Sequence, residues 1–225
     1  MKNKVSVLFM LAGILFATCL LISNLLASKI MMVGPWSAPA GVLIFPLAYI
    51  INDVFAEVWG YQKTRIIIWA GFGVNILAVL FFSLGIAVEG APFWQNQEAF
   101  ATVLGSTPRI VAASMLAYLT GSFLNAWVMS KVKVLTKGKS FSLRAIVSTL
   151  IGEGADSAIF ITVAFAGIFP LKVMLIMILT QALIKTVYEI AVLPVTIGVV
   201  NWVKKQEGID TFDYNVSYNP FRLKA

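Results

Sequence analysis

Four acidic residues stand in two pairs inside otherwise apolar stretches of this sequence. Asp53 and Glu57 lie in FPLAYIINDVFAEVWGYQKTR, and Glu153 and Asp156 lie in STLIGEGADSAIFITVAFAG. Spacings of four and three residues place the two members of each pair on one face of a helix. A charge at membrane depth costs about 3 kcal/mol on insertion scales. We therefore expect these carboxylates to face protein or one another, where they can accept hydrogen bonds from a polar ligand or hold a proton.

A third polar stripe lies in the apolar run QALIKTVYEIAVLP, which contains Gln181, Lys185 and Glu189. Two simpler interpretations stay open beside the functional one. Lys185 and Glu189, four residues apart, could neutralise each other within one helix. In the first acidic pair, Glu57 could lie at the membrane interface while only Asp53 is deep and paired with a lysine. The acids nevertheless outnumber the bases, which predicts a cavity suited to a cation, a proton or a ligand rich in N–H donors.

Neutral and aromatic side chains accompany these stripes. Polar residues such as Asn24 are, taken singly, more often interhelical hydrogen-bond partners than ligand contacts. Phe45 and Phe160 stand beside polar stripes, where an aromatic ring can stack on a planar ligand. The predicted substrate-binding set comprises Asn24, Phe45, Asn52, Asp53, Glu57, Glu153, Asp156, Phe160, Gln181, Lys185 and Glu189.

The composition is that of an integral membrane protein. Of 225 residues, 60% are hydrophobic and 12% are charged, whereas soluble domains are about 25% charged. At roughly 20 residues per crossing, the chain accommodates six helices with short loops. We expect an all-α fold with a transmembrane domain over 1–203 and a short cytoplasmic tail over 204–225. The predicted spans are 5–28, 38–59, 66–88, 110–130, 145–168 and 171–203.

The basic residues predict the orientation of these helices. Most of the 17 lysines and arginines fall in the connections that lie inside if the N-terminus is cytoplasmic, among them the stretches 63–65, 131–144 and 204–205. The positive-inside rule then places both the N-terminus and the C-terminus in the cytoplasm. The net charge of +7 is explained by this topology, so no nucleic-acid partner is expected.

Missing residue types and motifs exclude several functions. The sequence has no histidine and a single cysteine, Cys19, which removes the usual zinc sites and the Ser-His and Cys-His nucleophile pairs. It contains no glycine-rich loop of the kind that holds ATP phosphates. We expect neither a cofactor nor an enzymatic activity. One enzymatic alternative is an intramembrane aspartyl protease that uses Asp53 and Asp156, but it leaves the other intramembrane charges without a role.

The arrangement of the acids also suggests internal symmetry. Six helices divide into two halves of three, and the middle helix of each half carries an acidic pair. Inverted repeats that meet at a midplane site recur in transporters, and two such halves are a hypothesis here. The small residues Ala70, Gly71 and Gly73 would permit a homodimer or close packing within one protomer.

Five motifs together resemble the queuosine precursor transporter family, the vitamin uptake transporter group that was once described as a domain of unknown function. They are NDVFAEVWGYQKTR (52–65), RIVAASMLAYLTGSFLNAWV (109–128), STLIGEGADSAIFITVAFAG (148–167), QALIKTVYEIAVLP (181–194) and YNPF (218–221). The resemblance covers nearly the whole chain. The motifs are specific as a set, although each alone would be weak.

This resemblance implies a six-helix carrier in the inner membrane of a prokaryote. Its substrate would be a 7-deazaguanine, such as 7-cyano- or 7-aminomethyl-7-deazaguanine, taken up for queuosine-modified tRNA. Members of the group are similar to the six-helix substrate-binding subunits of energy-coupling-factor vitamin transporters. A secondary carrier is the main expectation, and a binding subunit that docks on an ATP-driven module is the alternative.

The resemblance also assigns roles within the predicted set. Asp53 or Asp156 would hold the guanine-like edge of the base, and Lys185 would balance charge or contact its carbonyl. Glu153 stands at a position that is variable and often uncharged in the family, so its role in substrate binding is less secure than that of Asp156. A coupled proton would be carried by one of the remaining acids: Glu57, Glu153 or Glu189.

Overall fold

The structure, a computed structural model, describes residues 6–26, 29–33, 36–105 and 108–222. Within these ranges the chain is helical apart from one short hairpin, the loops between the elements and the segment that follows the last helix. The elements are α1 (Val7–Leu26), β1 (Ile30–Val33), β2 (Trp36–Pro39), the 3-10 turn η1 (Ala40–Leu43), α2 (Phe45–Val58), α3 (Tyr61–Ala87), α4 (Gln97–Leu104), α5 (Pro108–Leu135), α6 (Phe141–Phe165) and α7 (Leu171–Glu207).

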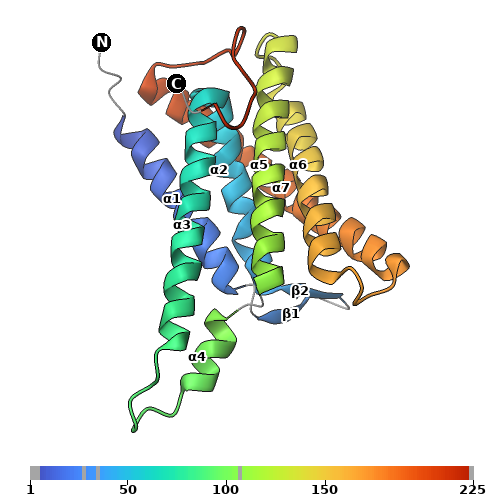
Figure 1. The fold of residues 1–225 in the computed structure, drawn as a ribbon. Helices are drawn as coiled ribbons and strands as arrows, with labels where there is room; N and C mark the ends of the chain where they lie inside the picture. The colour runs from blue at the N-terminus through green and yellow to red at the C-terminus, as the bar shows by residue number, and fades with distance from the viewer. Residues whose placement is uncertain (1–5, 27–28, 34–35, 106–107, 223–225) are drawn as a thin grey trace.

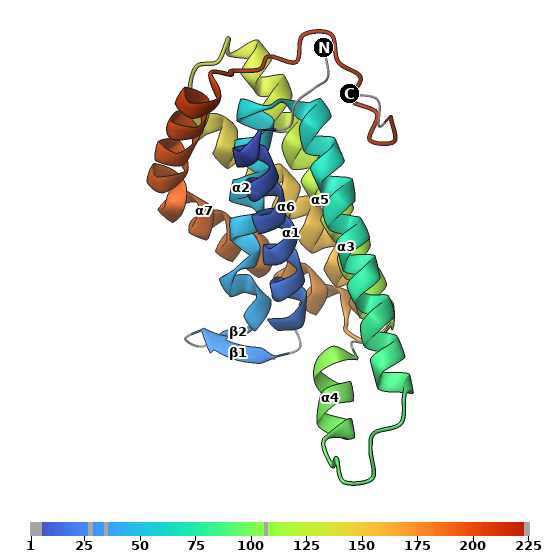
Figure 2. The same cartoon turned by 90° about the vertical axis from the view of Figure 1, so that its left-hand side faces the viewer.

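The helices α1, α2, α3, α5, α6 and α7 form a bundle and run between the same two ends of the molecule (Figure 1). Helix α1 begins and α7 ends at one of these ends, which also holds the α2–α3 and α5–α6 turns. The β1–β2 hairpin, α4 and the α6–α7 turn lie at the other end (Figures 1 and 2). We call these the terminal end and the hairpin end.

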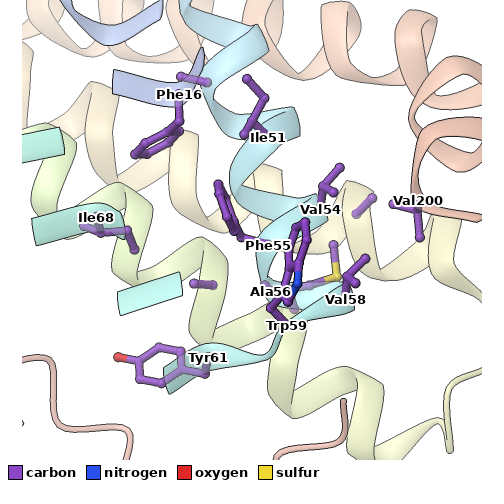
Figure 3. Packing of buried hydrophobic residues seen from close by; sticks show 14 of the residues in the cluster. Phe16, Ile51, Val54, Phe55, Ala56, Val58, Trp59, Tyr61, Ile68 and Val200 are labelled. Atoms are coloured by element: carbon purple, nitrogen blue, oxygen red, sulfur yellow. The ribbon is translucent and has the colours of Figure 1, made fainter. Parts of the chain in front are cut away.

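Helix α2 is the centre of the bundle. It packs against α1, α3, α5 and α7, and every residue from Ala48 to Val58 is buried. Phe55 packs edge-on against Phe16 of α1, with ring centroids 6.4 Å apart, and lies beside Trp59 (Figure 3). The expectation that the α2 acids face protein rather than lipid is therefore confirmed.

Among the described residues, four helices are long and apolar enough to cross a membrane: α1, α3, α6 and α7. The chain is thus a helical membrane protein, as the composition predicted. Helix α5 has 28 residues but is not among these four, and α2 has only 14. A helix of that length covers about 21 Å at a rise of 1.5 Å per residue, less than the hydrocarbon core of a bilayer.

The predicted single helix over 38–59 is wrong in its first part. Its opening residues complete the β1–β2 hairpin, in which Met31 pairs with Ala38, and continue through η1. Helix α2 starts only at Phe45, with Pro46 in its first turn, where a missing N–H is harmless. The stretch before it is a continuous apolar run, and periodicity alone does not distinguish such a run from helix.

The last helix continues past the predicted end at 203 to Glu207. It runs unbroken through Pro194 and bends as it crosses the bundle obliquely (Figures 1 and 2), as expected where proline removes a backbone hydrogen bond. At the other extreme of the chain, the ends of the predicted span 5–28 lie outside the described residues.

The segment that follows α7, residues 209–222, is irregular and packs across the terminal end. The carboxylate of Asp213 accepts a hydrogen bond from the backbone N–H of Tyr61 (2.9 Å) and from the hydroxyl of Ser130 (2.5 Å). Trp69 donates from its indole nitrogen to the carbonyl of Pro220 (2.8 Å). Asp213 therefore satisfies one free N–H at the start of α3.

Candidate functional site

A buried lysine on α7 joins two acids on α6. Lys185 is 3% exposed, and its ammonium nitrogen lies 2.6 Å from Asp156 Oδ2 and 2.6 Å from Glu153 Oε2. Because these acids are one turn apart on α6, a single ammonium group reaches both. The alternative in which Lys185 and Glu189 neutralise each other is wrong, since the ion pairs of Lys185 go to α6.

Two aromatic rings of α2 cover this ion cluster. The Lys185 ammonium lies 4.2 Å from the centre of the Phe45 ring, within the range of a cation–π contact. The Phe45 and Tyr49 rings are 5.4 Å apart. Tyr49 Oη and the Asp156 Cβ both adjoin Gly121 of α5. The cluster therefore combines acceptors, one cation and aromatic faces within a buried volume.

Close packing of α5 against α6 brings these groups together. A Cβ added at Gly121 would lie 2.2 Å from Tyr49 Oη and 2.9 Å from the carbonyl oxygen of Gly152. A Cβ at Gly152 would lie 2.9 Å from the carbonyl oxygen of Gly121. Only glycine allows two helices to approach this closely, so this crossing fixes the position of Asp156 relative to α2.

An amide pair connects α2 to α5 beside the cluster. Asn52 Nδ2 donates to Asn125 Oδ1 (2.6 Å) and to the carbonyl of Ser122 (3.2 Å). The other atoms of the two amides, Asn52 Oδ1 and Asn125 Nδ2, are buried and have no hydrogen-bond partner among the described residues. Asn52 Oδ1 is thus available to a ligand, while Asn125 Nδ2 lies beside Asp53.

Glu189 follows Lys185 by one turn of α7, toward the terminal end, and Asp53 of α2 lies beside Glu189. The exposed fractions of Asp53 and Glu189 are 0% and 1%, and their carboxyl groups face each other as direct electrostatic neighbours. Within the described part of the chain, neither carboxyl group takes part in an ion pair or accepts a hydrogen bond. Asp53 is therefore not paired with a lysine, contrary to the simpler interpretation.

Unpartnered polar atoms are concentrated around these residues. More than 90% of buried polar groups in proteins have a hydrogen-bond partner, so such a concentration indicates a place where water or a ligand binds. Among the buried side chains with an atom that lacks a hydrogen-bond partner in the described part of the chain are Tyr49, Asn52, Asp53, Asn125, Thr149, Ser157 and Glu189.

Glu57 belongs to a different cluster at the terminal end. Arg144 donates two hydrogen bonds to its carboxylate, the longer at 3.1 Å, and Lys204 Nζ lies 2.6 Å from Oε1. Lys133 Nζ lies 3.4 Å from the same oxygen. Glu57 is fully buried among these cations, and its predicted place at the membrane interface stays a prediction.

Asp210, which follows α7, extends this terminal cluster. Lys133 and Lys204 both form ion pairs with its carboxylate, the second at 3.0 Å. Partial burial acts to raise the pKa of Asp210, but the hydrogen bonds from the two lysines outweigh it and hold that pKa below its ordinary value. The terminal cluster thus consists of paired charges that link α2, α5, α6 and α7.

Three members of the predicted set have no described contact with the lysine. Asn24 donates to Asn75 of α3 and accepts from Ser114 of α5 at 3.3 Å, so its side chain makes an interhelical link. Phe160 packs edge-on against Phe165, with ring centroids 6.0 Å apart. Gln181 is half-buried, one turn before Lys185 on α7.

The predicted set omitted Tyr49 and Thr149, although a sequence signal for both exists. Tyr49 is midway between Phe45 and Asp53 at steps of four residues, and Thr149 precedes Glu153 by the same step. Extending each acidic face by one turn finds both residues. Along α2 the face then reads Phe45, Tyr49, Asp53 and Glu57, from the hairpin end to the terminal end.

The chemistry of this cluster suits the binding of a small polar molecule. In the part of the chain that the structure describes, no group of three or more His, Cys, Asp and Glu side chains is placed to hold a metal ion. Asp156 also differs from a protease aspartate, because Lys185 neutralises it. Carboxylate acceptors, one ammonium donor and free amide atoms beside aromatic rings match a planar ligand with several hydrogen-bonding groups.

Comparisons with known proteins agree with this picture. Residues 39–199 match the sequence profile of the family described as "Putative vitamin uptake transporter". The "Probable queuosine precursor transporter" of Bacillus subtilis (strain 168) is 29% identical over 174 residues, which cover 76% of each chain. No solved structure matches significantly. The resemblance drawn from the motifs is confirmed at the level of the family. The chain belongs to the vitamin uptake transporter family.

Proposed function

We propose that this protein is a secondary carrier that imports a queuosine precursor across the cytoplasmic membrane of a prokaryote. The substrate would be 7-cyano-7-deazaguanine, 7-aminomethyl-7-deazaguanine or both. The observation that carries the proposal is the buried Lys185, held between Asp156 and Glu153 beside the Phe45 ring. The name of the Bacillus relative supports the substrate class.

A 7-deazaguanine would use each of these groups. Its N1–H and exocyclic amine form two donors on one edge, and a carboxylate accepts such a pair in bidentate geometry; charge-assisted hydrogen bonds are about twice as strong as neutral ones. We assign this contact to Asp156. Lys185 would donate to the base carbonyl, and Phe45 or Tyr49 would stack on its plane.

Six crossings with both termini in the cytoplasm account for the arrangement of the bundle. Helices α1, α2, α3, α5, α6 and α7 alternate in direction between the two ends (Figures 1 and 2). The second crossing would combine η1 with the short α2, and discontinuous spans of this kind are typical of transporter substrate sites. The inverted three-helix halves and the likeness to energy-coupling-factor subunits remain part of the proposal.

Direct binding tests this function. Purified protein is titrated with 7-cyano-7-deazaguanine, its aminomethyl analogue, queuine and guanine. We expect tight binding of a deazaguanine, weakened about 10- to 100-fold in Asp156→Asn, because a charge-assisted hydrogen bond contributes about 1.5–3 kcal/mol. Glu98→Gln, on the exposed face of α4, is the matched control and should bind as the wild type does.

The outcomes separate the proposals. Binding that survives Asp156→Asn moves the site away from α6 while retaining the substrate class. Binding of none of these bases contradicts the substrate class itself. Co-purification of the chain with ATPase subunits would favour the alternative, a binding subunit of an ATP-driven importer.

Oligomeric state belongs to the same proposal. Gly71 packs within the protomer, since an added Cβ would lie 2.9 Å from Tyr118 Oη. A Cβ added at Gly73, two residues further along α3, would have no described atom within 4 Å. A homodimer would therefore use the Gly73 face, and cross-linking there would detect it.

A further inference from the structure

The base site proposed above leaves the pair formed by Asp53 and Glu189 unused. These two acids come from α2 and α7, are fully buried, and face each other. The cations nearest to them are already engaged, because Lys185 pairs with Glu153 and Asp156. The pair is thus a buried anionic site without a counter-cation in the described residues.

Two neutral side chains complete the surroundings of the pair. Asn125 of α5 lies beside Asp53, and Thr149 of α6 lies beside Glu189. Both are 1% exposed or less, and Asn125 Nδ2 and Thr149 Oγ1 have no hydrogen-bond partner among the described residues. Each can donate to a carboxylate oxygen. Four helices therefore each contribute one polar group to the surroundings of the pair, which indicates a preformed binding site.

Two carboxylates that face each other in a low-dielectric interior are not both ionised, because each charge raises the cost of the other. We propose that Asp53 and Glu189 share one proton and form the proton-coupling site of the carrier, separate from the Asp156–Lys185 base site. A second proton, taken from one side of the membrane, binds the carboxylate oxygen that remains free in the singly protonated pair, and the doubly protonated pair then releases one H⁺ to the other side and returns to its singly protonated form. This inference rests on the proposed import function.

A proton suits the pair better than a metal ion does. Calcium takes six to eight oxygen ligands, whereas the pair offers two carboxyl groups and two donors. A donor such as Asn125 Nδ2 cannot ligate a cation, but it stabilises the carboxyl oxygen that does not carry the proton. The chemistry of all four groups is consistent with this single occupant.

Charges around the pair connect it to the base site. On α2, Glu57 acts on Asp53, but Arg144, Lys133 and Lys204 neutralise it. On α6, Glu153 is a neighbour of both Lys185 and Glu189. Helix α7 contributes Lys185 itself, and the described part of α5 contributes only the neutral Asn125. Because Glu153 interacts with both sites, base binding and proton binding affect each other's affinity reciprocally.

Transport in proteoliposomes tests the inference. Uptake of radiolabelled 7-cyano-7-deazaguanine is measured with and without an inside-alkaline pH gradient, at zero membrane potential. The measured quantity is the ratio of the uptake rate with the gradient to the rate without it. We expect this ratio to be several-fold for the wild type and for Glu98→Gln, and near one for Glu189→Gln and Asp53→Asn. The ratio does not depend on how far a variant lowers the basal rate. A wild-type ratio in either variant overturns the inference.

Failure of the inference differs from failure of the proposed function. A wild type that binds and exchanges the base but ignores the gradient contradicts the coupling site alone. A wild type that does not bind any base contradicts the import function instead.

Infrared spectroscopy of the wild type provides a test that needs no folded variant and no substrate. The shared proton should give the C=O stretch of a buried protonated carboxyl at neutral pH, shifted in deuterium oxide. The absence of this band overturns the inference. Where the variants fold, Asp53→Asn and Glu189→Gln should each lose the band, and Glu98→Gln should retain it.

Discussion

At the scale of single residues, the ammonium group of Lys185 compensates two carboxylates at once. Breaking a buried ion pair by removing one partner costs about 3–5 kcal/mol. We therefore expect Lys185→Met to destabilise the protein by an amount of this order, because Glu153 and Asp156 both lose their cation. Thermal unfolding in detergent, scored against the wild type, measures the loss.

A double variant distinguishes the charge from the shape of the side chain. Lys185→Met with Asp156→Asn leaves one acid in place of two and should recover part of the lost stability. If the double variant is as unstable as the single one, packing of the lysine chain, and not its charge, determines the effect.

The sequence predicted the buried acids well and their partners poorly. Spacing alone placed Glu153 and Asp156 on one face, because neighbours on a helix are fixed by its geometry. The partners of Glu57 come from α5, α6 and α7 (Lys133, Arg144 and Lys204). Such pairs depend on tertiary packing, which no local pattern in one sequence specifies.

At the scale of elements, the crossing of α5 and α6 controls the geometry of the base site. Gly121→Ala would place a methyl group against Tyr49 Oη and the Gly152 carbonyl. Overpacking of this kind costs about 1–3 kcal/mol, so we expect lower stability together with weaker binding of the deazaguanine. Both are measured on the same purified protein.

Gly154 of α6 is the matched control. An added Cβ there meets no described atom within 4 Å, and alanine is favoured over glycine in helices. Gly154→Ala should leave binding unchanged and leave stability equal or slightly higher. Equal losses in both variants would contradict a special role for the α5–α6 crossing.

The helices and strands differ in how well they could be predicted from the sequence. The long apolar helices follow from composition and length, and their ends lie within a few residues of the predicted ones. The hairpin before α2 was missed because its residues are as apolar as a helix in the same place. The extended backbone at Met31 and Ala38 depends on pairing between two strands, which a single-strand pattern does not show.

At the scale of the whole molecule, the orientation of the bundle can be tested with cysteines. Native Cys19 is 2% exposed and should react little. A membrane-impermeant maleimide added to intact cells should label Glu98→Cys on α4, at the hairpin end. Lys139→Cys, in the α5–α6 turn at the terminal end, should be labelled only after lysis. The reverse pattern would contradict the proposed cytoplasmic location of the terminal end.

The segment 209–222 has a consequence for the order in which this protein is made. Ribosomes synthesise it after every helix, yet Asp213 binds the start of α3 and Pro220 holds Trp69. The contacts of residues 209–222 therefore form only after the helices have been synthesised, and the terminal end is completed when this segment emerges from the ribosome. Until then the backbone N–H of Tyr61, at the start of α3, has no aspartate to accept its hydrogen bond.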